Sequence, residues 1–204
     1  MSAQETKEKI LKISLTLFSR RGYDAVSVRD ICGRVPIKES TMYYYFCGKR
    51  EIMQVLLQRF EEKAEGLMNR MERELAAPRQ PGAGFGDGVT QGFFEEYLMD
   101  EFCNSILRLL RMERENDREF EKIYDEWMFE RPLYFQQKIF SALAERGLFG
   151  QADCAELAVE YYAPIFLYTE RWLMCGELTE EKKERFRREA GKQTARFFHD
   201  KGVI

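Results

Sequence analysis

Apolar residues recur with helical spacing through nearly every segment of this chain of 204 residues. No strand-length segment shows the alternation of apolar and polar residues that marks a half-buried strand. Ile10, Leu17 and Phe18, for example, fall on one face of a helix. The spacing predicts an all-α protein of about nine helices, over residues 3–21, 27–35, 38–45, 49–77, 89–112, 117–129, 132–146, 153–175 and 180–200.

Capping residues at the predicted helix ends support the first two of these helices. Ser2 with Glu5, and Ser27 with Asp30, have the spacing of a capping box. Gly22 is suited to end the first helix as a left-handed cap. The chain therefore turns sharply between its first and second helices.

Residues 78–88 form the one segment rich in both Gly and Pro. They neither follow a strand nor match a phosphate-binding loop, so we interpret them as a linker. We predict a three-helix head at residues 1–48 and a larger helical body at residues 49–204, with the helix at 49–77 connecting the two.

Charge is divided unequally between these parts. Residues 1–60 carry eleven Lys and Arg against six Asp and Glu, a net charge of +5, whereas the remainder carries −8. A basic head on an acidic body indicates a polyanionic partner for the head.

Composition argues against a membrane or secreted protein. No apolar run approaches the roughly 20 residues of a membrane-spanning helix, and the polar N-terminus lacks the apolar core of a signal peptide. The five cysteines are scattered without C-x-x-C spacing, which favours reduced thiols over disulfides. We expect a cytoplasmic protein without membrane partners.

Residues 27–46 have the pattern of two short helices joined by a tight turn, a helix-turn-helix. If Met42 and Phe46 face the core, then Ser40 and Tyr44 point outward. The three consecutive tyrosines at 43–45 span about 200° of a helix, so they cannot all be buried. The second helix should therefore present a polar and aromatic surface.

From Leu17 to Phe60 the sequence resembles the tetracycline-repressor (TetR) family of bacterial regulators. The similarity runs without a gap through the head, whereas the body resembles the family only in the number and length of its helices. It is carried by Phe18, Arg21, Gly22, Tyr23, Ser27, Val28, Arg29, Asp30, Ile31, Thr41, Met42, Tyr43, Tyr44, Tyr45, Phe46, Lys49, Glu51 and Ile52.

The resemblance implies a homodimer whose two heads enter successive major grooves of a double-stranded, pseudo-palindromic DNA operator. It also implies a body that binds a small-molecule effector, which moves the heads apart and releases the DNA. We add Lys38 and Ser40 to the implied DNA contacts, which gives Arg29, Lys38, Ser40, Thr41, Tyr43, Tyr44, Tyr45 and Lys49. For Arg29, a surface salt bridge is an equal alternative.

Several positions depart from the family pattern. Pro36 replaces the usual turn glycine and cannot supply a positive φ, so the turn should differ locally or be strained. Lys38 replaces the usual capping serine, at a cost of about 1 kcal/mol to the third helix. Glu39 is unusual on a DNA-facing helix. It could accept from a cytosine, face water or pair with a basic residue of the protein.

The body is rich in large apolar residues that suit either a packed core or an aromatic-lined ligand pocket. The pocket candidates are Phe94, Tyr97, Phe102, Ile106, Trp127, Tyr134, Tyr168 and Trp172. The resemblance further implies a four-helix dimer interface from the last two helices, with candidates Val159, Tyr162, Phe166, Phe186, Ala190 and Phe197.

Enzyme chemistry finds no support in the sequence. The single histidine, His199, lies near the C-terminus and is expected at the surface. No catalytic set, metal-ligand cluster or cofactor motif can be assembled around it. The sequence thus predicts a ligand-responsive transcriptional regulator, a repressor by resemblance. The alternatives are a small-molecule-binding adaptor that retains the head, or a small helical enzyme.

Overall fold

The computed structural model describes residues 2–76, 90–147 and 153–202, and none of these residues lies in a strand. This confirms the predicted all-α class. The linker predicted at 78–88 lies outside the described residues. The helices are α1 (Ala3–Arg21), α2 (Val28–Arg34), α3 (Glu39–Tyr45), α4 (Lys49–Ala76), η1 (Phe94–Leu98), α6 (Glu101–Glu113), α7 (Arg118–Asp125), η2 (Glu126–Glu130), α8 (Arg131–Glu145), α9 (Cys154–Tyr168), η3 (Thr169–Leu173) and α10 (Glu180–Asp200), where η denotes a π-helix.

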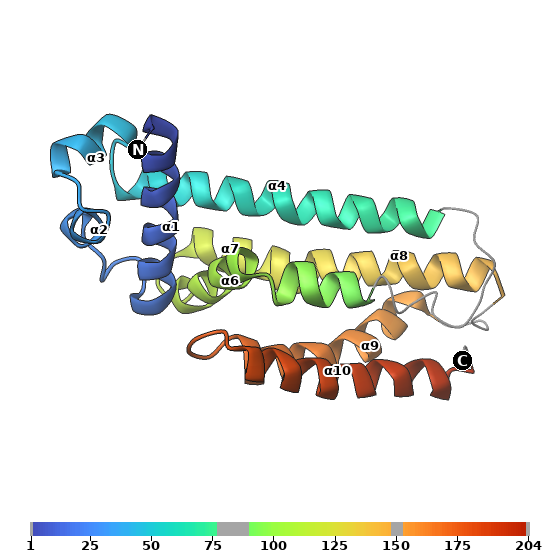
Figure 1. The fold of residues 1–204 in the computed structure, drawn as a ribbon. Helices are drawn as coiled ribbons and strands as arrows, with labels where there is room; N and C mark the ends of the chain where they lie inside the picture. Colours follow the sequence, from blue (N-terminus) through green and yellow to red (C-terminus); the bar gives the residue numbers. More distant parts are fainter. Residues whose placement is uncertain (1, 77–89, 148–152, 203–204) are drawn as a thin grey trace.

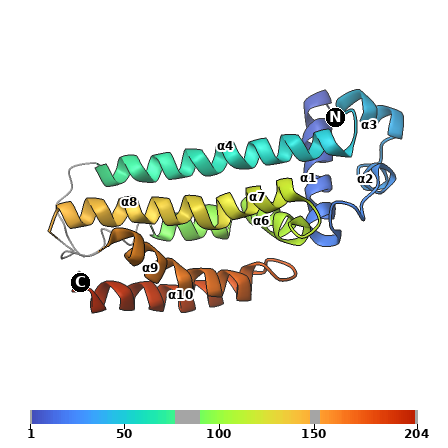
Figure 2. The same ribbon diagram turned by 180° about the vertical axis from the view of Figure 1, so that it is seen from behind.

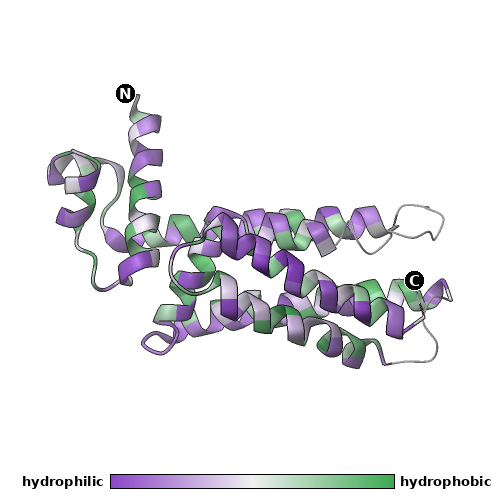
Figure 3. Ribbon diagram, turned by 60° about the horizontal axis from the view of Figure 1, so that its bottom comes forward, coloured by the Kyte–Doolittle hydropathy of each residue, from purple (hydrophilic) through white to green (hydrophobic). Residues whose placement is uncertain are grey.

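Helices α1, α2 and α3 gather at one end of the molecule, and α4 runs from them along the body (Figure 1). Helix α8 lies alongside α4, and α9 packs against both α8 and α10. The view from behind shows α10 on the side of the body opposite α4 (Figure 2). Hydrophilic and apolar residues are interspersed along each helix, as expected for amphipathic helices around a shared core (Figure 3).

The capping boxes at Ser2 and Ser27 are both present, and each serine accepts from the backbone N–H of the acidic residue three positions later. Gly22 ends α1 with a φ of +87° and a ψ of 156°. The positive φ agrees with the expectation for glycine, but this ψ lies outside the left-handed helical region. The chain leaves α1 in an extended direction rather than through the predicted left-handed cap.

The helix predicted at residues 89–112 is interrupted. Its first part ends in η1, and α6 begins afresh after Asp100, whose carboxylate accepts from the backbone N–H of Cys103 at 2.9 Å. Asp100 has extended backbone angles and is the N-cap of α6. The prediction of one helix was wrong because Asp100 competes with the backbone as a local acceptor.

The two helices predicted at 117–129 and from Pro132 are joined in the structure. Helix α7 continues through η2 directly into α8, with Pro132 in the first turn of α8. The backbone N–H of Arg131 bonds to the carbonyl of Glu126, five residues back. Since Pro132 has no N–H, one backbone hydrogen bond is missing among the carbonyls of this turn, which include those of Trp127 and Met128.

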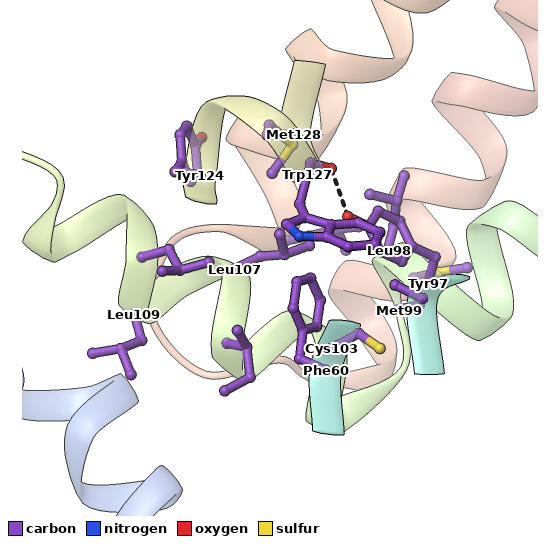
Figure 4. Close-up of a cluster of buried hydrophobic side chains, with 14 of the residues drawn as sticks. Phe60, Tyr97, Leu98, Met99, Cys103, Leu107, Leu109, Tyr124, Trp127 and Met128 are labelled. Atoms are coloured by element: carbon purple, nitrogen blue, oxygen red, sulfur yellow. Dashed lines mark hydrogen bonds between the residues drawn. The ribbon is translucent and has the colours of Figure 1, made fainter. Parts of the chain in front are cut away.

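Two buried tyrosines satisfy these carbonyls. The Tyr97 hydroxyl donates to the carbonyl of Trp127 at 2.5 Å (Figure 4), and the Tyr162 hydroxyl donates to that of Met128 at 2.8 Å. Burial raises the pKa of both tyrosines, so both hydroxyls stay protonated and remain donors. The proline and the tyrosines together explain why η2 is stable inside the core.

The helix predicted at 153–175 also changes type near its end, where α9 passes into η3. The buried side chain of Asn104 joins η1 to η3, because its amide donates to the carbonyls of Leu98 at 3.0 Å and Leu173 at 3.3 Å. Side chains of η1, α6 and α9 thus cross-link all three π-helices inside the body.

Candidate nucleic-acid interface

Helix α2 is fixed at its start by a reciprocal pair. The backbone N–H of Asp30 donates to the Ser27 hydroxyl at 3.1 Å, and the backbone N–H of Ser27 donates to the Asp30 carboxylate at 2.8 Å. Hydrogen bonds from the Ser27 hydroxyl and backbone lower the pKa of Asp30 to about 2. The carboxylate therefore stays charged, and it also meets Arg21 at 3.3 Å.

The turn between α2 and α3 keeps the geometry of a glycine turn without the glycine. Pro36 has a φ of +31°, far from the value near −65° that its ring prefers. The backbone N–H of Ile37 bonds to the carbonyl of Cys32 at 3.2 Å, which is the outer hydrogen bond of a Schellman motif. The expectation that Pro36 cannot adopt a positive φ was wrong, and the alternative of a strained turn is what the structure shows.

Helix α3 begins at Glu39 after Lys38, whose side chain makes no capping hydrogen bond. Met42 and Phe46 are buried in the head core, while the side chain of Tyr44 is 80% exposed and that of Tyr43 53% exposed. Tyr45 is half-buried, with its ring against the edge of Tyr44 at 5.1 Å between centroids. The predicted division of this helix into a core face and an aromatic outer face is present.

The remaining predicted contacts on α2 and α3 have different surroundings. Lys38 and Ser40 are exposed, and Thr41 is partly exposed. Arg29 is exposed too, but its guanidinium lies 3.0 Å from the Glu39 carboxylate. This is the salt-bridge alternative, and it also gives Glu39 a partner within the head. An exposed pair of this kind contributes little to stability and opens easily.

Lys49 is engaged within the protein. Its ammonium donates to the carbonyl of Tyr23 at 2.7 Å, lies 4.1 Å from the centre of the Tyr23 ring, and is 3.9 Å from Asp24. Its side chain is only 22% exposed. Lys49 therefore fastens the start of α4 to the turn after α1, a role that the sequence pattern did not predict.

Tyr23 is the point where head and body meet. Its backbone N–H donates to the buried Glu113 carboxylate of α6 at 2.8 Å, and its ring makes edge contacts with Phe18 of α1 and Phe120 of α7. Because the Glu113 carboxylate would lie 2.8 Å from a Cβ at Gly22, no larger residue fits there without movement. The end of α1 is thus clamped between α4, α6 and α7.

A second contact from α6 reinforces this clamp. The buried guanidinium of Arg108 donates to the carbonyl of Ser19 near the end of α1, at 3.0 Å. Sequence reasoning selected neither Arg108 nor Glu113 for this contact. In the sequence, an acid in the last turn of an amphipathic helix resembles any surface residue, so no local signal distinguishes it.

The predicted pocket residues of the body lie in several places. Phe94, Tyr97, Ile106 and Trp127 are packed inside the core, and Tyr97 and Trp127 are fixed further by the hydrogen bond at η2. Tyr168 and Trp172 are half-buried, and Tyr134 is exposed on α8. Phe102 lines a cavity of about 290 Å³ between α1, α4 and α6.

The predicted dimer residues divide in the same way. Tyr162, Phe186, Ala190 and Phe197 are buried within the subunit, and Phe166 is half-buried against Phe129. Of the six, Val159 alone is strongly exposed, at 54%. Leu167 on the same helix, which sequence reasoning did not select, is 59% exposed.

His199 lies exposed beside Asp200, as expected. Within the described residues, no three side chains of His, Cys, Asp or Glu are grouped to hold a metal ion. None of the five cysteines forms a disulfide, and burial raises the pKa of Cys103 to about 12, which makes this thiol unreactive. In the same part of the chain, no helix combines the length and apolar character needed to span a membrane.

Comparison with known proteins agrees with this geometry. Residues 10–56 match the family model described as "Bacterial regulatory proteins, tetR family". The structure superposes on that of a putative TetR-family transcriptional regulator from Mesorhizobium loti MAFF303099 with a TM-score of 0.69, over 98% of both chains at 19% identity. The head of this chain matches the TetR family.

Two further proteins are similar to this chain, one over a short stretch of sequence and one over the whole fold. The biofilm operon icaADBC HTH-type negative transcriptional regulator IcaR of Staphylococcus aureus (strain Newman) is 44% identical over 46 residues. The match covers 22% of this chain and a quarter of that protein. A SmeT–triclosan complex superposes with a TM-score of 0.72 at 17% identity, over 98% of this chain and 94% of that one. Such structural likeness establishes the fold.

Proposed function

We propose that this protein is a TetR-family, DNA-binding transcriptional repressor that a small-molecule effector releases from its operator. The observation that carries the proposal is the outer face of α3, where Tyr43 and Tyr44 stand exposed on a basic head that matches the family model. Aromatic hydroxyls and nearby cations suit contacts to phosphates and base edges in a major groove. The proposal places the protein in the cytoplasm, where operator DNA is located.

Two relatives support the direction and the trigger of regulation. IcaR is named a negative regulator, and the SmeT structure contains triclosan. By analogy, we assign repression to the DNA-bound state of this chain and release to an effector bound in the body. The family match also disfavours the small helical enzyme considered from the sequence, since the family is described as regulatory proteins.

The DNA contacts that we propose come from the exposed residues of the head. Lys38, Ser40, Thr41, Tyr43 and Tyr44 form the central set, with Tyr45 supporting Tyr44 through their ring contact. Arg29 joins them once its pair with Glu39 opens. Lys49 contacts a phosphate only through the N–H groups that it does not donate to Tyr23.

We propose that dimerisation uses the outer faces of α9 and α10. Val159 and Leu167 are exposed and lie eight residues apart, so they stand within about 80° of each other around α9. Replacement of both by glutamate should convert a dimer to a monomer while the subunit keeps its helical content. Sedimentation velocity with circular dichroism measures both, and a variant that remains dimeric would remove this face from the interface.

The contacts at Tyr23 provide the proposed route from effector to DNA. Glu113 and Arg108, both on α6, hold the end of α1, and the opposite end of α6 begins at Asp100 beside η1 in the body core. A ligand that displaces α6 would therefore move the head through these contacts, and the movement need not be transmitted along α4. This supports a rigid displacement of the head relative to the body.

Operator binding tests the proposed function directly. After selection of bound sequences from random DNA, the double variant Tyr44→Ala with Lys38→Ala should lose operator binding and still form the same oligomer. The matched control removes an exposed tyrosine and a lysine from the body, Tyr134→Ala with Lys138→Ala. Equal operator affinity in both double variants would refute the assignment of α3 as the DNA-reading helix.

A further inference from the structure

The ion pair between Arg29 and Glu39 joins α2 to α3, the two helices at the end of the molecule away from the body (Figure 1). The Nε of Arg29 donates to the Oε1 of Glu39 at 3.0 Å, and the two side chains are 85% and 45% exposed. In the part of the chain that the structure describes, this is the one hydrogen bond that either side chain makes. The terminal nitrogens of Arg29 and the second carboxylate oxygen of Glu39 therefore have no protein partner there.

The structural reasons for an acid at position 39 are weak. Of the two acidic residues in α2 and α3, Asp30 caps α2 through Ser27, whereas the Glu39 carboxylate bonds only to Arg29 among the described residues. An ion pair this exposed adds little to stability. A carboxylate in the first turn of α3 also gains from the helix dipole, but this gain is small at the surface. The dipole remains the alternative explanation, since Lys38 supplies no side-chain cap.

The position of Glu39 on α3 is one from which a helix-turn-helix contacts bases. Glu39 is the first residue of α3, and the N-terminal residues of a recognition helix reach base edges in the major groove. It lies four residues before the exposed Tyr43, so the two share the outer face of the helix. The proposed DNA contact of Arg29 opens the ion pair and leaves a carboxylate near the phosphates. That arrangement is unfavourable unless the carboxylate accepts a hydrogen bond from the DNA.

The base edges of the major groove offer such a carboxylate few donors. The amino groups of cytosine and adenine are the two donors there, at N4 and N6. In adenine, N6 lies beside the acceptor N7, which repels a carboxylate, whereas cytosine presents its amino group without an acceptor beside it on the same base. A carboxylate therefore favours cytosine. The guanine paired with that cytosine presents O6 and N7, the two acceptors that an arginine binds.

We infer that Glu39 is a specificity-determining residue: its carboxylate accepts from N4 of a cytosine in each operator half-site, and Arg29 donates to the guanine paired with that cytosine. The inference rests on the proposed function and deepens it by naming a base pair of the operator. In the free head the acid and the base already lie side by side, in an order that complements the donor of cytosine beside the acceptors of guanine.

Selection of bound sequences from random DNA, with the wild-type protein and with Glu39→Gln, tests the cytosine contact. Sequences selected by the wild-type protein should share a C·G base pair at one position of each half-site. Because glutamine both donates and accepts, it bonds to N6 and N7 of adenine. Glu39→Gln should therefore select A·T at that position and bind the wild-type operator roughly tenfold more weakly.

The matched control is Asp24→Asn, which also removes one negative charge from an exposed side chain of the head and should keep the wild-type base preference. If Glu39→Gln keeps that preference too, the inference is overturned. The helix dipole then explains Glu39, and Glu39→Gln lowers Tm and weakens binding to all sequences alike. If the wild-type protein selects no sequence at all, the proposed function fails and the inference fails with it.

A modified base tests the Arg29 half of the inference. Replacement of the guanine by 7-deazaguanine removes N7 and keeps O6, so the wild-type protein should bind this operator about fivefold more weakly. The variant Arg29→Met has no guanidinium to lose this bond, so it should bind the modified and unmodified operators equally. The same loss in both proteins would overturn the contact between Arg29 and this guanine.

Discussion

Replacement of Pro36 by glycine should stabilise the protein, contrary to the usual effect of exchanging proline for glycine in a turn. At a φ of +31°, a residue with a restricted backbone carries about 1–3 kcal/mol of strain, which glycine does not have. Glycine also restores the N–H that completes the second bond of the Schellman motif, worth about 1 kcal/mol. Against this, the unfolded chain gains freedom worth about 1–2 kcal/mol. The net gain is about 1 kcal/mol.

The comparison of Pro36→Gly with Pro36→Ala isolates the positive φ. Alanine restores the same N–H but pays about 1–2 kcal/mol in the left-handed region, whereas glycine pays about 0.5–1 kcal/mol in entropy relative to alanine. Glycine should therefore be ahead of alanine by about 0.5–1 kcal/mol at this position. At Arg34, an exposed helical position in the last turn of α2, the variant Arg34→Ala should instead be more stable than Arg34→Gly.

Thermal unfolding followed by circular dichroism, with urea unfolding as a check on two-state behaviour, measures both orders. A gain of 1 kcal/mol corresponds to a rise of about 2–4 °C in Tm for a chain of this size. If Pro36→Ala is as stable as Pro36→Gly, the turn does not adopt a positive φ in solution. If Pro36→Gly is less stable than the wild-type protein, the argument from strain is wrong.

Three further predictions concern the head. Lys38→Met should flatten the dependence of operator affinity on salt by about one unit of slope. Lys49→Met should lower Tm and flatten the slope less, since the Lys49 ammonium is shared with Tyr23; equal slopes in the two variants would contradict this division. Glu113→Ala should cost about 1–3 kcal/mol by leaving the N–H of Tyr23 unpaired, and Glu113→Gln, which keeps an acceptor, should cost less in urea unfolding. Ser27→Ala should raise the pKa of Asp30 from about 2, measured by NMR titration of its carboxyl. Because the pKa of Asp30 is depressed in the folded state, its carboxylate stabilises the fold at pH values above its ordinary pKa, and this contribution is lost as the pH falls toward 2. If stability falls with acid in the same way in the wild-type protein and in Ser27→Ala, this prediction is contradicted.

Much of the head could be predicted from the sequence because its determinants are local. The serine–acid pairs that begin α1 and α2 act over three residues, and the helical period alone places Met42 inside and Tyr44 outside. The family pattern covers the same stretch without a gap. These features depend on residues that are close in the sequence, so they can be predicted without the tertiary structure.

The body was less predictable because its helix types depend on distant partners. Pro132 pointed to a new helix, but Tyr97 and Tyr162 donate to carbonyls of the turn before it, so the chain continues through η2. Tyr97 is thirty residues away from its partner. Period and propensity cannot reveal such a contact, because the hydroxyl could equally have faced water.

The sequence by itself determined the helical class, the basic helix-turn-helix and the aromatic outer face of α3, since each follows from spacing, composition or capping within a few residues. Only the tertiary structure decided that Lys49 holds Tyr23, that the Glu113 carboxylate accepts from the same residue 90 positions away, and that Tyr162 satisfies the Met128 carbonyl. The physical reason is that a charged or hydroxyl side chain has the same local preferences whether it meets water, DNA or a buried partner. Its role is set by the groups that folding brings within hydrogen-bonding distance.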